Sequence, residues 1–167
     1  NVTLLEKAMQ AGARRIELCD NLAVGGTTPS YGVTKAAVEL ASNYDTTIMT
    51  MIRPRGGDFV YHDMEIAIML EDIRLTAQAG SQGVVFGALT TDKKLDKANL
   101  EKLIAASKGM EIVFHMAFDE LSDEEQLEAI DWLSQAGVTR ILTRAGVSGD
   151  SLEKRFEHYH RILEHAK

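Results

Sequence analysis

A glutamate and a cysteine alternate with apolar residues in one short segment, Ile16-Glu17-Leu18-Cys19. In an extended strand, alternate side chains face opposite sides, so Glu17 and Cys19 share one face. A carboxylate on the inner face of a sheet needs a partner, which is either a ligand in an acid/base site or a structural cation. Cys19 is either a small buried hydrophobe or a ligand for a soft metal.

Two arginines beside a glycine pair form the second candidate group, in the segment RPRGG at 53–57. Arginine offers a rigid fork of donors, and glycine lets backbone N–H groups approach a ligand. We therefore expect Arg53, Arg55 and Gly57 to contact a substrate or another anion. The alternative is that Arg53 neutralises Glu17 across the interior, which would make the two residues a coupled pair.

A histidine and an aspartate, His115 and Asp119, lie at the end of a later apolar segment. A histidine at a strand end serves as a general acid/base or as a metal ligand, and Asp119 would orient it or bind a ligand hydroxyl. Thr143 opens another loop that we expect to contact an anion. His158 and His165 share a face of the last helical segment, and we expect both to be solvated.

Five short apolar segments, separated by helical patterns, must position these residues. They are rich in β-branched and aromatic residues, as buried parallel strands are, and they lie at 15–19, 47–53, 83–87, 111–116 and 139–143. A Gln-Ala-Gly triplet closes three of the helical patterns shortly before a strand. This repeat indicates strand–helix units with right-handed crossovers. Ligands of such folds bind beyond the C-terminal ends of the strands, where the candidate residues lie.

Two architectures fit this pattern, an open doubly wound sheet and part of a (β/α)8 barrel. The pattern alone slightly favours the open sheet, because a complete barrel usually needs about 250 residues and only five strands are visible in 167. Thr28 and Pro29 have the pattern of a helix N-cap followed by a proline in the first turn. No linker is visible, so residues 1–167 are expected to form a single domain.

Composition argues against several classes of function. The net charge of −7 speaks against a basic surface for nucleic acid or for an anionic membrane. No apolar run approaches the ~18 residues of a membrane span. A single cysteine excludes a disulfide scaffold and suits a reducing cytoplasm. No dinucleotide-binding glycine motif and no Walker motif is present, so no nucleotide cofactor is expected.

Several ordered motifs resemble those of the CutC family. They are RIELCDNLA at 15–23, GGTTPSYG at 25–32, MIRPRGGDF at 51–59, GVVFG at 83–87, FH at 114–115, AFD at 117–119 and RILT at 140–143. The resemblance implies a (β/α)8 TIM-type barrel, of which this chain would cover about strands two to six. The first strand would precede Asn1, and the last two units would follow Lys167. The resemblance also implies a cytoplasmic protein of copper homeostasis, with copper(I) as an expected ligand.

Two positions depart from the family pattern. The family usually has HRAFD where this chain has Met116 in place of the arginine, and its Thr-Ser-Gly stretch is Thr143-Arg144-Ala145 here. Both departures weaken the expectation, taken from the family, that these positions bind an anion. Cys19 matches the family's second cysteine, whereas the first would lie before the start of this chain.

Two functions of different classes therefore stay open. In the first, a copper homeostasis protein uses Cys19 as a soft ligand for copper(I). In the second, a barrel enzyme acts on a small anionic or hydroxylated substrate, with Glu17, His115 and Asp119 in acid/base roles and Arg53 on the anion. A third reading is a non-catalytic assembly module. We also expect a homo-oligomer, most simply a dimer, because the strands visible here would leave two parallel sheet edges exposed.

Overall fold

The computed structural model describes residues 2–146 and 149–166. Within these residues, five strands form one parallel sheet in the order β1-β2-β3-β4-β5. The strands are β1 (Arg15–Leu18), β2 (Thr47–Met51), β3 (Gly83–Phe86), β4 (Glu111–Phe114) and β5 (Arg140–Ile141). All five predicted strands are confirmed, and each ends one or two residues earlier than the sequence predicts.

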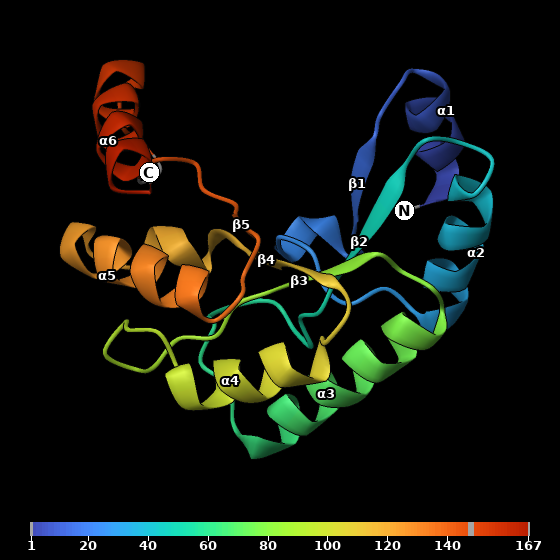
Figure 1. The fold of residues 1–167 in the computed structure, drawn as a ribbon, viewed down its shortest axis with the longest axis horizontal. Coiled ribbons are helices and arrows are strands. Elements are labelled where there is room, and N and C mark those ends of the chain that lie inside the picture. Colours follow the sequence, from blue (N-terminus) through green and yellow to red (C-terminus); the bar gives the residue numbers. More distant parts are fainter. Residues whose placement is uncertain (1, 147–148, 167) are drawn as a thin grey trace.

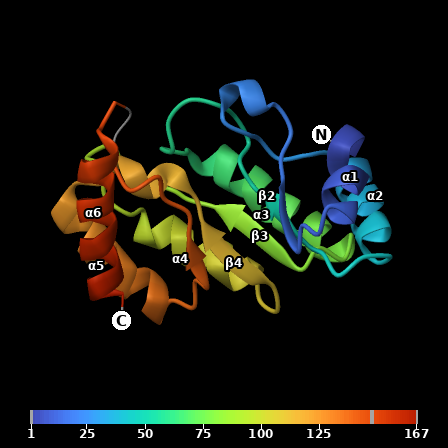
Figure 2. The ribbon, with the colours of Figure 1, turned by 90° about the horizontal axis from the view of Figure 1, so that it is seen from above.

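The helices surround the outside of the curled sheet (Figure 1). Figure 2 shows α1 and α2 at one end of the arc and α5 and α6 at the other, with α3 and α4 between them. The α-helices are α1 (Leu5–Gln10), α2 (Tyr31–Ala41), α3 (Asp63–Gln78), α4 (Lys97–Ala106), α5 (Asp123–Gln135) and α6 (Leu152–His165). The described residues also form three short 3-10 helices, η1 (Val2–Leu4), η2 (Leu22–Val24) and η3 (Met116–Glu120).

The strand order makes the architecture a half-barrel of the (β/α)8 type. Each strand pairs with the next one along the chain, whereas an open doubly wound sheet reverses its order at a switch point and carries helices on both faces. The curl is strong enough for Arg15 of β1 to reach Glu111 of β4, with Nη2 3.5 Å from Oε2. The preference for an open sheet that the pattern alone suggested is therefore wrong.

Strand alternation divides the apolar residues between two faces of the sheet. On the convex face, Leu18 and Ile48 are buried against helices α1 and α2. On the concave face, Cys19 packs in a separate buried cluster, which consists of Cys19, Met49, Met51, Val85 and Val113. The predicted alternation in β1 is confirmed, and the concave side is filled largely by methionine and valine.

Helix α2 begins two residues later than the sequence predicts. Ser30 is the N-cap, and its Oγ accepts a hydrogen bond from the Val33 N–H at 3.3 Å. Thr28 instead makes two hydrogen bonds with the backbone of Arg53: its N–H donates to the Arg53 carbonyl, and its Oγ1 accepts from the Arg53 N–H, each at 2.9 Å. The predicted cap is wrong because Thr28 joins the loop after β1 to the end of β2.

We predict that Gly83→Ala destabilises the protein by about 1–3 kcal/mol, because the concave face has no room for a methyl group. A Cβ at Gly83 would press on the Met49 side chain and would lie 2.7 Å from the Glu111 carbonyl oxygen. Urea unfolding measures the change. The control is Gly32→Ala in α2, where the nearest atom to an added Cβ is Ser30 Oγ at 3.9 Å. That variant should be neutral or slightly stabilising, and similar losses in both variants would contradict the packing argument.

Candidate functional site

A cavity of about 260 Å³ lies beyond the C-terminal ends of the strands, and we call it the central cavity. It brings together four residues that the sequence singled out: Glu17, Arg53, Gly57 and His115. The other lining residues are Val24, Gly25, Met51, Phe59, Met116, Glu120, Leu142 and Arg144. The cavity has the location expected for a ligand site in a parallel α/β fold.

Arg53 is buried in the wall of the central cavity and is held by backbone carbonyls. Its Nη1 donates to Val24 O at 2.8 Å and to Gly26 O at 2.9 Å, and its Nη2 donates to Gly57 O at 2.7 Å. Gly25 has a φ of +87°, and a Cβ there would lie 3.3 Å from Arg53 Nη1. Glycine therefore suits this turn for its left-handed backbone and for its lack of a side chain.

The predicted ion pair between Arg53 and Glu17 is wrong. The ion pairs of the described residues include none for Arg53, although its side chain is only 5% exposed. The carbonyl oxygens accept hydrogen bonds from the Arg53 side chain but carry no net charge. They therefore do not neutralise the positive charge of the guanidinium beside the cavity. The aromatic ring of Phe59 lies next to Arg53, with the ring centroid 5.0 Å from the guanidinium carbon.

His115 contributes a neutral ring to the cavity wall. Its Nδ1 accepts a hydrogen bond from the Ala117 N–H at 3.2 Å, which assigns the proton of the neutral ring to Nε2. Burial lowers the pKa of His115 to about 3, and the nearby Arg53 charge adds to that shift. The buried Nε2 has no hydrogen-bond partner within the described structure. The ring is thus arranged as a donor, and it is poorly suited to accept a proton or to ligate a metal through Nδ1.

Glu17 and Cys19 both lie on the concave side, as the sequence predicts. The Cys19 thiol donates to Glu17 Oε1, with Sγ 3.6 Å from the oxygen. Burial raises the pKa of Glu17, and the hydrogen bond from Cys19 opposes that shift. Burial and then the Glu17 charge raise the pKa of Cys19 to about 12. Glu17 reaches the central cavity, whereas Cys19 lies in the buried cluster with the methionines.

Arg55 lies outside the central cavity, although the sequence suggests that it binds an anion. Its Nε lies 2.5 Å from Glu65 Oε1, and its Nη2 lies 3.0 Å from Asp58 Oδ1. Its Nη2 also donates to the Val60 carbonyl at 2.7 Å. Arg55 therefore fastens the loop after β2 to the first turn of α3, and its charge is already balanced by two carboxylates.

Asp119 and Thr143 pair with each other away from the central cavity. Thr143 Oγ1 donates to Asp119 Oδ1, and Asp119 Oδ2 accepts from the Arg144 backbone N–H at 3.1 Å and from its Nε at 3.3 Å. This arrangement fixes the loop after β5 and aims Arg144 at the cavity, which Arg144 lines. Sequence reasoning missed Arg144 as a site residue because the position departs from the family pattern.

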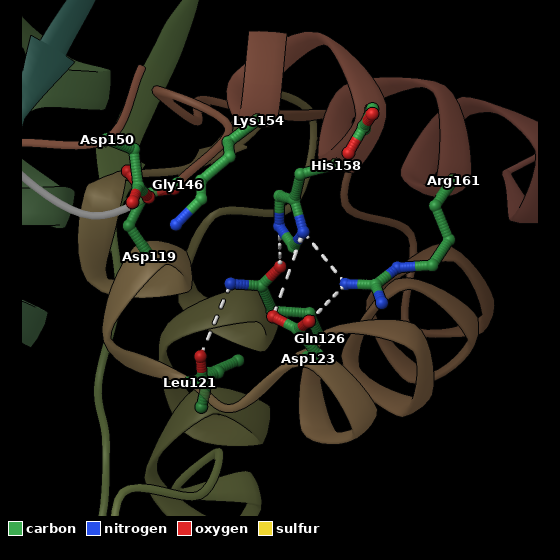
Figure 3. A pocket seen from close by; sticks show the side chains of 10 residues that line it. Asp119, Leu121, Asp123, Gln126, Gly146, Asp150, Lys154, His158 and Arg161 are labelled. Carbon is green, nitrogen blue, oxygen red and sulfur yellow. Dashed lines mark hydrogen bonds and ion pairs between the residues drawn. The ribbon is translucent and has the colours of Figure 1, made fainter. Parts of the chain in front are cut away.

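A separate cavity of about 500 Å³ lies between α5 and α6 (Figure 3). His158 lies there, and its Nε2 is 2.7 Å from Gln126 Oε1. Arg161 reaches both His158 Nδ1, at 2.8 Å, and Asp123, at 2.5 Å (Figure 3). His165 also has an acidic partner, Asp131, at 3.0 Å. The expectation of a solvated side chain is confirmed for His165, which is exposed, and is wrong for His158, which is half-buried. The packing of α6 on α5 gives His158 partners that the sequence of one helix cannot reveal.

Among the described residues, no group of three or more His, Cys, Asp or Glu side chains could hold a metal ion. In the same residues, every helix is too short or too polar to cross a bilayer.

Known proteins resemble this chain along its whole length. The CutC family profile matches residues 1–167. A CutC family protein of Enterococcus faecalis is 49% identical over 166 residues, which are 99% of this chain and 79% of the relative. One of Streptococcus pyogenes is 45% identical over the same share of each chain.

Solved structures agree with this grouping. The CutC protein of Streptococcus agalactiae, which its name assigns to copper homeostasis, is 43% identical with a TM-score of 0.95. The match covers 99% of this chain and 79% of that one. A Schiff-base-forming fructose-1,6-bisphosphate aldolase is 14% identical with a TM-score of 0.64, over 95% of this chain and 62% of its own, and it supports the barrel fold alone. The sequence motifs, the half-barrel and these relatives agree, and the chain belongs to the CutC family.

Proposed function

We propose that this protein is an enzyme that acts on a small anionic or hydroxylated substrate in the central cavity. The observation that carries the proposal is Arg53, a buried cation at the cavity wall without a carboxylate partner in the described part of the chain. A buried charge without a counter-charge is costly. An anionic ligand, or an oxygen that becomes negative during a reaction, would supply the missing charge.

The neighbouring groups suggest a division of roles. Glu17 is the proposed proton acceptor, because it lines the cavity and burial raises its pKa above that of an ordinary glutamate. His115 would donate Nε2–H to a substrate oxygen, since its pKa of about 3 keeps the ring neutral. Asp119 is better understood as a positioning residue that holds Arg144 than as an acid or a base.

A second candidate function is copper(I) binding at Cys19, as the name of the Streptococcus agalactiae relative suggests. The observation that favours it is the convergence of soft side chains. A Cβ at Gly26 would lie 3.2 Å from Cys19 Sγ and 3.8 Å from Met51 Cε, and both residues belong to the buried concave cluster. A thiolate and thioethers suit copper(I), but the metal would have to displace the thiol proton. A cytoplasmic location and a dimeric state stay predictions.

Removal of the Glu17 charge should strengthen the binding of inorganic phosphate to the central cavity. Glu17 repels an anion from the cavity that Arg53 lines, so Glu17→Gln should lower the Kd by about tenfold. Arg53→Met should abolish binding. Isothermal titration calorimetry measures both effects, with Glu101→Gln, an exposed position on α4, as the control. Failure of both the wild type and Glu17→Gln to bind phosphate would count against an anion site here.

Acid should destabilise the fold through His115. Because its folded-state pKa of about 3 lies below the ordinary 6.5, the unfolded chain binds a proton that the folded chain does not between these values. The stability that the neutral His115 ring contributes is fully present above pH 6.5 and is lost as the pH falls toward 3. At pH 5 the loss amounts to about 2 kcal/mol. In urea melts at pH 7 and pH 5, His115→Gln should lose less stability than the wild type. The control is His160→Gln, on the exposed side of α6, and equal losses in all three proteins would refute a buried neutral ring.

If copper(I) binds this chain, Cys19→Ser should weaken its affinity by on the order of a hundredfold, because Cys19 is the only thiol. An anaerobic competition titration against a coloured copper(I) chelator measures the affinity. Met64→Leu is the control, since Met64 lies on α3 and is 71% exposed. An unchanged affinity in Cys19→Ser would exclude a copper site at this residue.

A further inference from the structure

A second hollow adjoins the central cavity, and we call it the side hollow. It has a volume of about 620 Å³, and Gly57, Phe59 and Glu120 line both spaces. Phe59 therefore forms a wall that the two spaces share. Its carbonyl accepts a hydrogen bond from the Leu89 N–H at 2.8 Å, which holds the loop after β2 to the loop after β3.

The polar groups of the side hollow are of mixed sign. Two carboxylates, Asp58 and Glu120, are accompanied by one ammonium, Lys93, and by the hydroxyls of Thr90 and Thr91. A hydrogen bond from the Val60 backbone and the Arg55 side chain lower the pKa of Asp58, which keeps it ionised. Asp58 pairs with Arg55 and Glu120 pairs with Lys93, so the described lining offers no uncompensated cation to a second anionic group. Hydroxyl groups suit this space, because each can donate to a carboxylate and accept from an ammonium.

Lys93 is held at the rim of the side hollow by an unfavourable backbone conformation. Its φ of +58° lies in the left-handed region, where residues other than glycine and asparagine are uncommon. The turn is closed by a hydrogen bond from the Lys93 N–H to the Thr90 carbonyl at 3.0 Å. The ammonium lies 3.5 Å from Glu120 Oε2, beside the wall shared with the central cavity. Strain of this kind is found more often at functional positions than elsewhere.

We propose that the substrate carries a polyhydroxylated tail beside its anionic group, and that this tail binds in the side hollow with Thr91, Lys93 and Glu120 as its polar partners. The inference rests on the proposed function, since it takes Arg53 and His115 to hold the anionic end. Phe59 offers the C–H face of such a tail an aromatic surface. The size and polarity of the side hollow then select for the length of the tail.

Calorimetry with two matched pairs of anions tests this inference. The pairs are inorganic phosphate with ribose 5-phosphate, and glycolate with gluconate. In at least one pair the polyhydroxylated member should bind about tenfold more tightly, which corresponds to one or two additional hydrogen bonds. Thr91→Val should reduce that advantage and leave the affinity for the short anion unchanged. Lys93→Ala should reduce the advantage and also weaken the binding of the short anion, because it removes the cation that pairs with Glu120 beside the central cavity.

The control is Lys94→Ala, because the Lys94 ammonium pairs with Glu125 at 2.7 Å and does not line the side hollow. Alanine is as strained as lysine at the φ of Lys93, so Lys93→Ala removes the ammonium without a change in backbone preference. Equal affinities within both pairs, or an advantage that survives both Lys93→Ala and Thr91→Val, would overturn the inference. If none of the four anions binds either the wild type or Glu17→Gln, the proposed function itself fails.

Discussion

The candidate site depends on the way one buried guanidinium is anchored. Arg53 donates to Val24 and Gly26, which follow β1, and to Gly57, which follows β2. These carbonyls would cost about 1–3 kcal/mol each if they were buried without a partner. A carboxylate in their place would have made Arg53 part of a neutral structural pair. Anchoring by carbonyls stabilises two loops and leaves the positive charge available to a ligand, so stability and electrostatics depend on the same side chain.

The curl of the sheet supplies the platform for that arrangement. Near the other end of the concave face, Arg15 and Arg140 both contact Glu111 from different strands, which links β1, β4 and β5. Between this ion-pair group and the central cavity, Met49 fills the space above Gly83. Methionine suits such an irregular space because its side chain is unbranched and flexible. The cavity therefore lies on a packed interior, and it is lined by Glu17 of β1, by Met51 of β2 and by residues of the loops and 3-10 helices that follow the strands.

The sequence predicted much of the fold because the relevant signals are local. Alternation in β1 places Glu17 and Cys19 on one side, and short apolar segments between helical patterns identify all five strands. The strand order is not local, and for this reason the pattern alone favoured an open sheet. Arg55 shows the same limit within the candidate site. Its type and its glycine neighbours suggest an anion ligand, but Glu65, ten residues away on α3, already balances its charge.

The sequence by itself determined which residues lie at the strand ends and on which face of the sheet each side chain lies, because a period of two residues follows from strand geometry. Only the tertiary structure decided what those residues contact. Arg53 donates hydrogen bonds to carbonyls up to 29 residues away and does not pair with Glu17. Asp119 accepts a hydrogen bond from Thr143, 24 residues away, and does not orient His115. Each contact depends on how the curl of the sheet brings separate loops together, and no short segment of sequence contains that information.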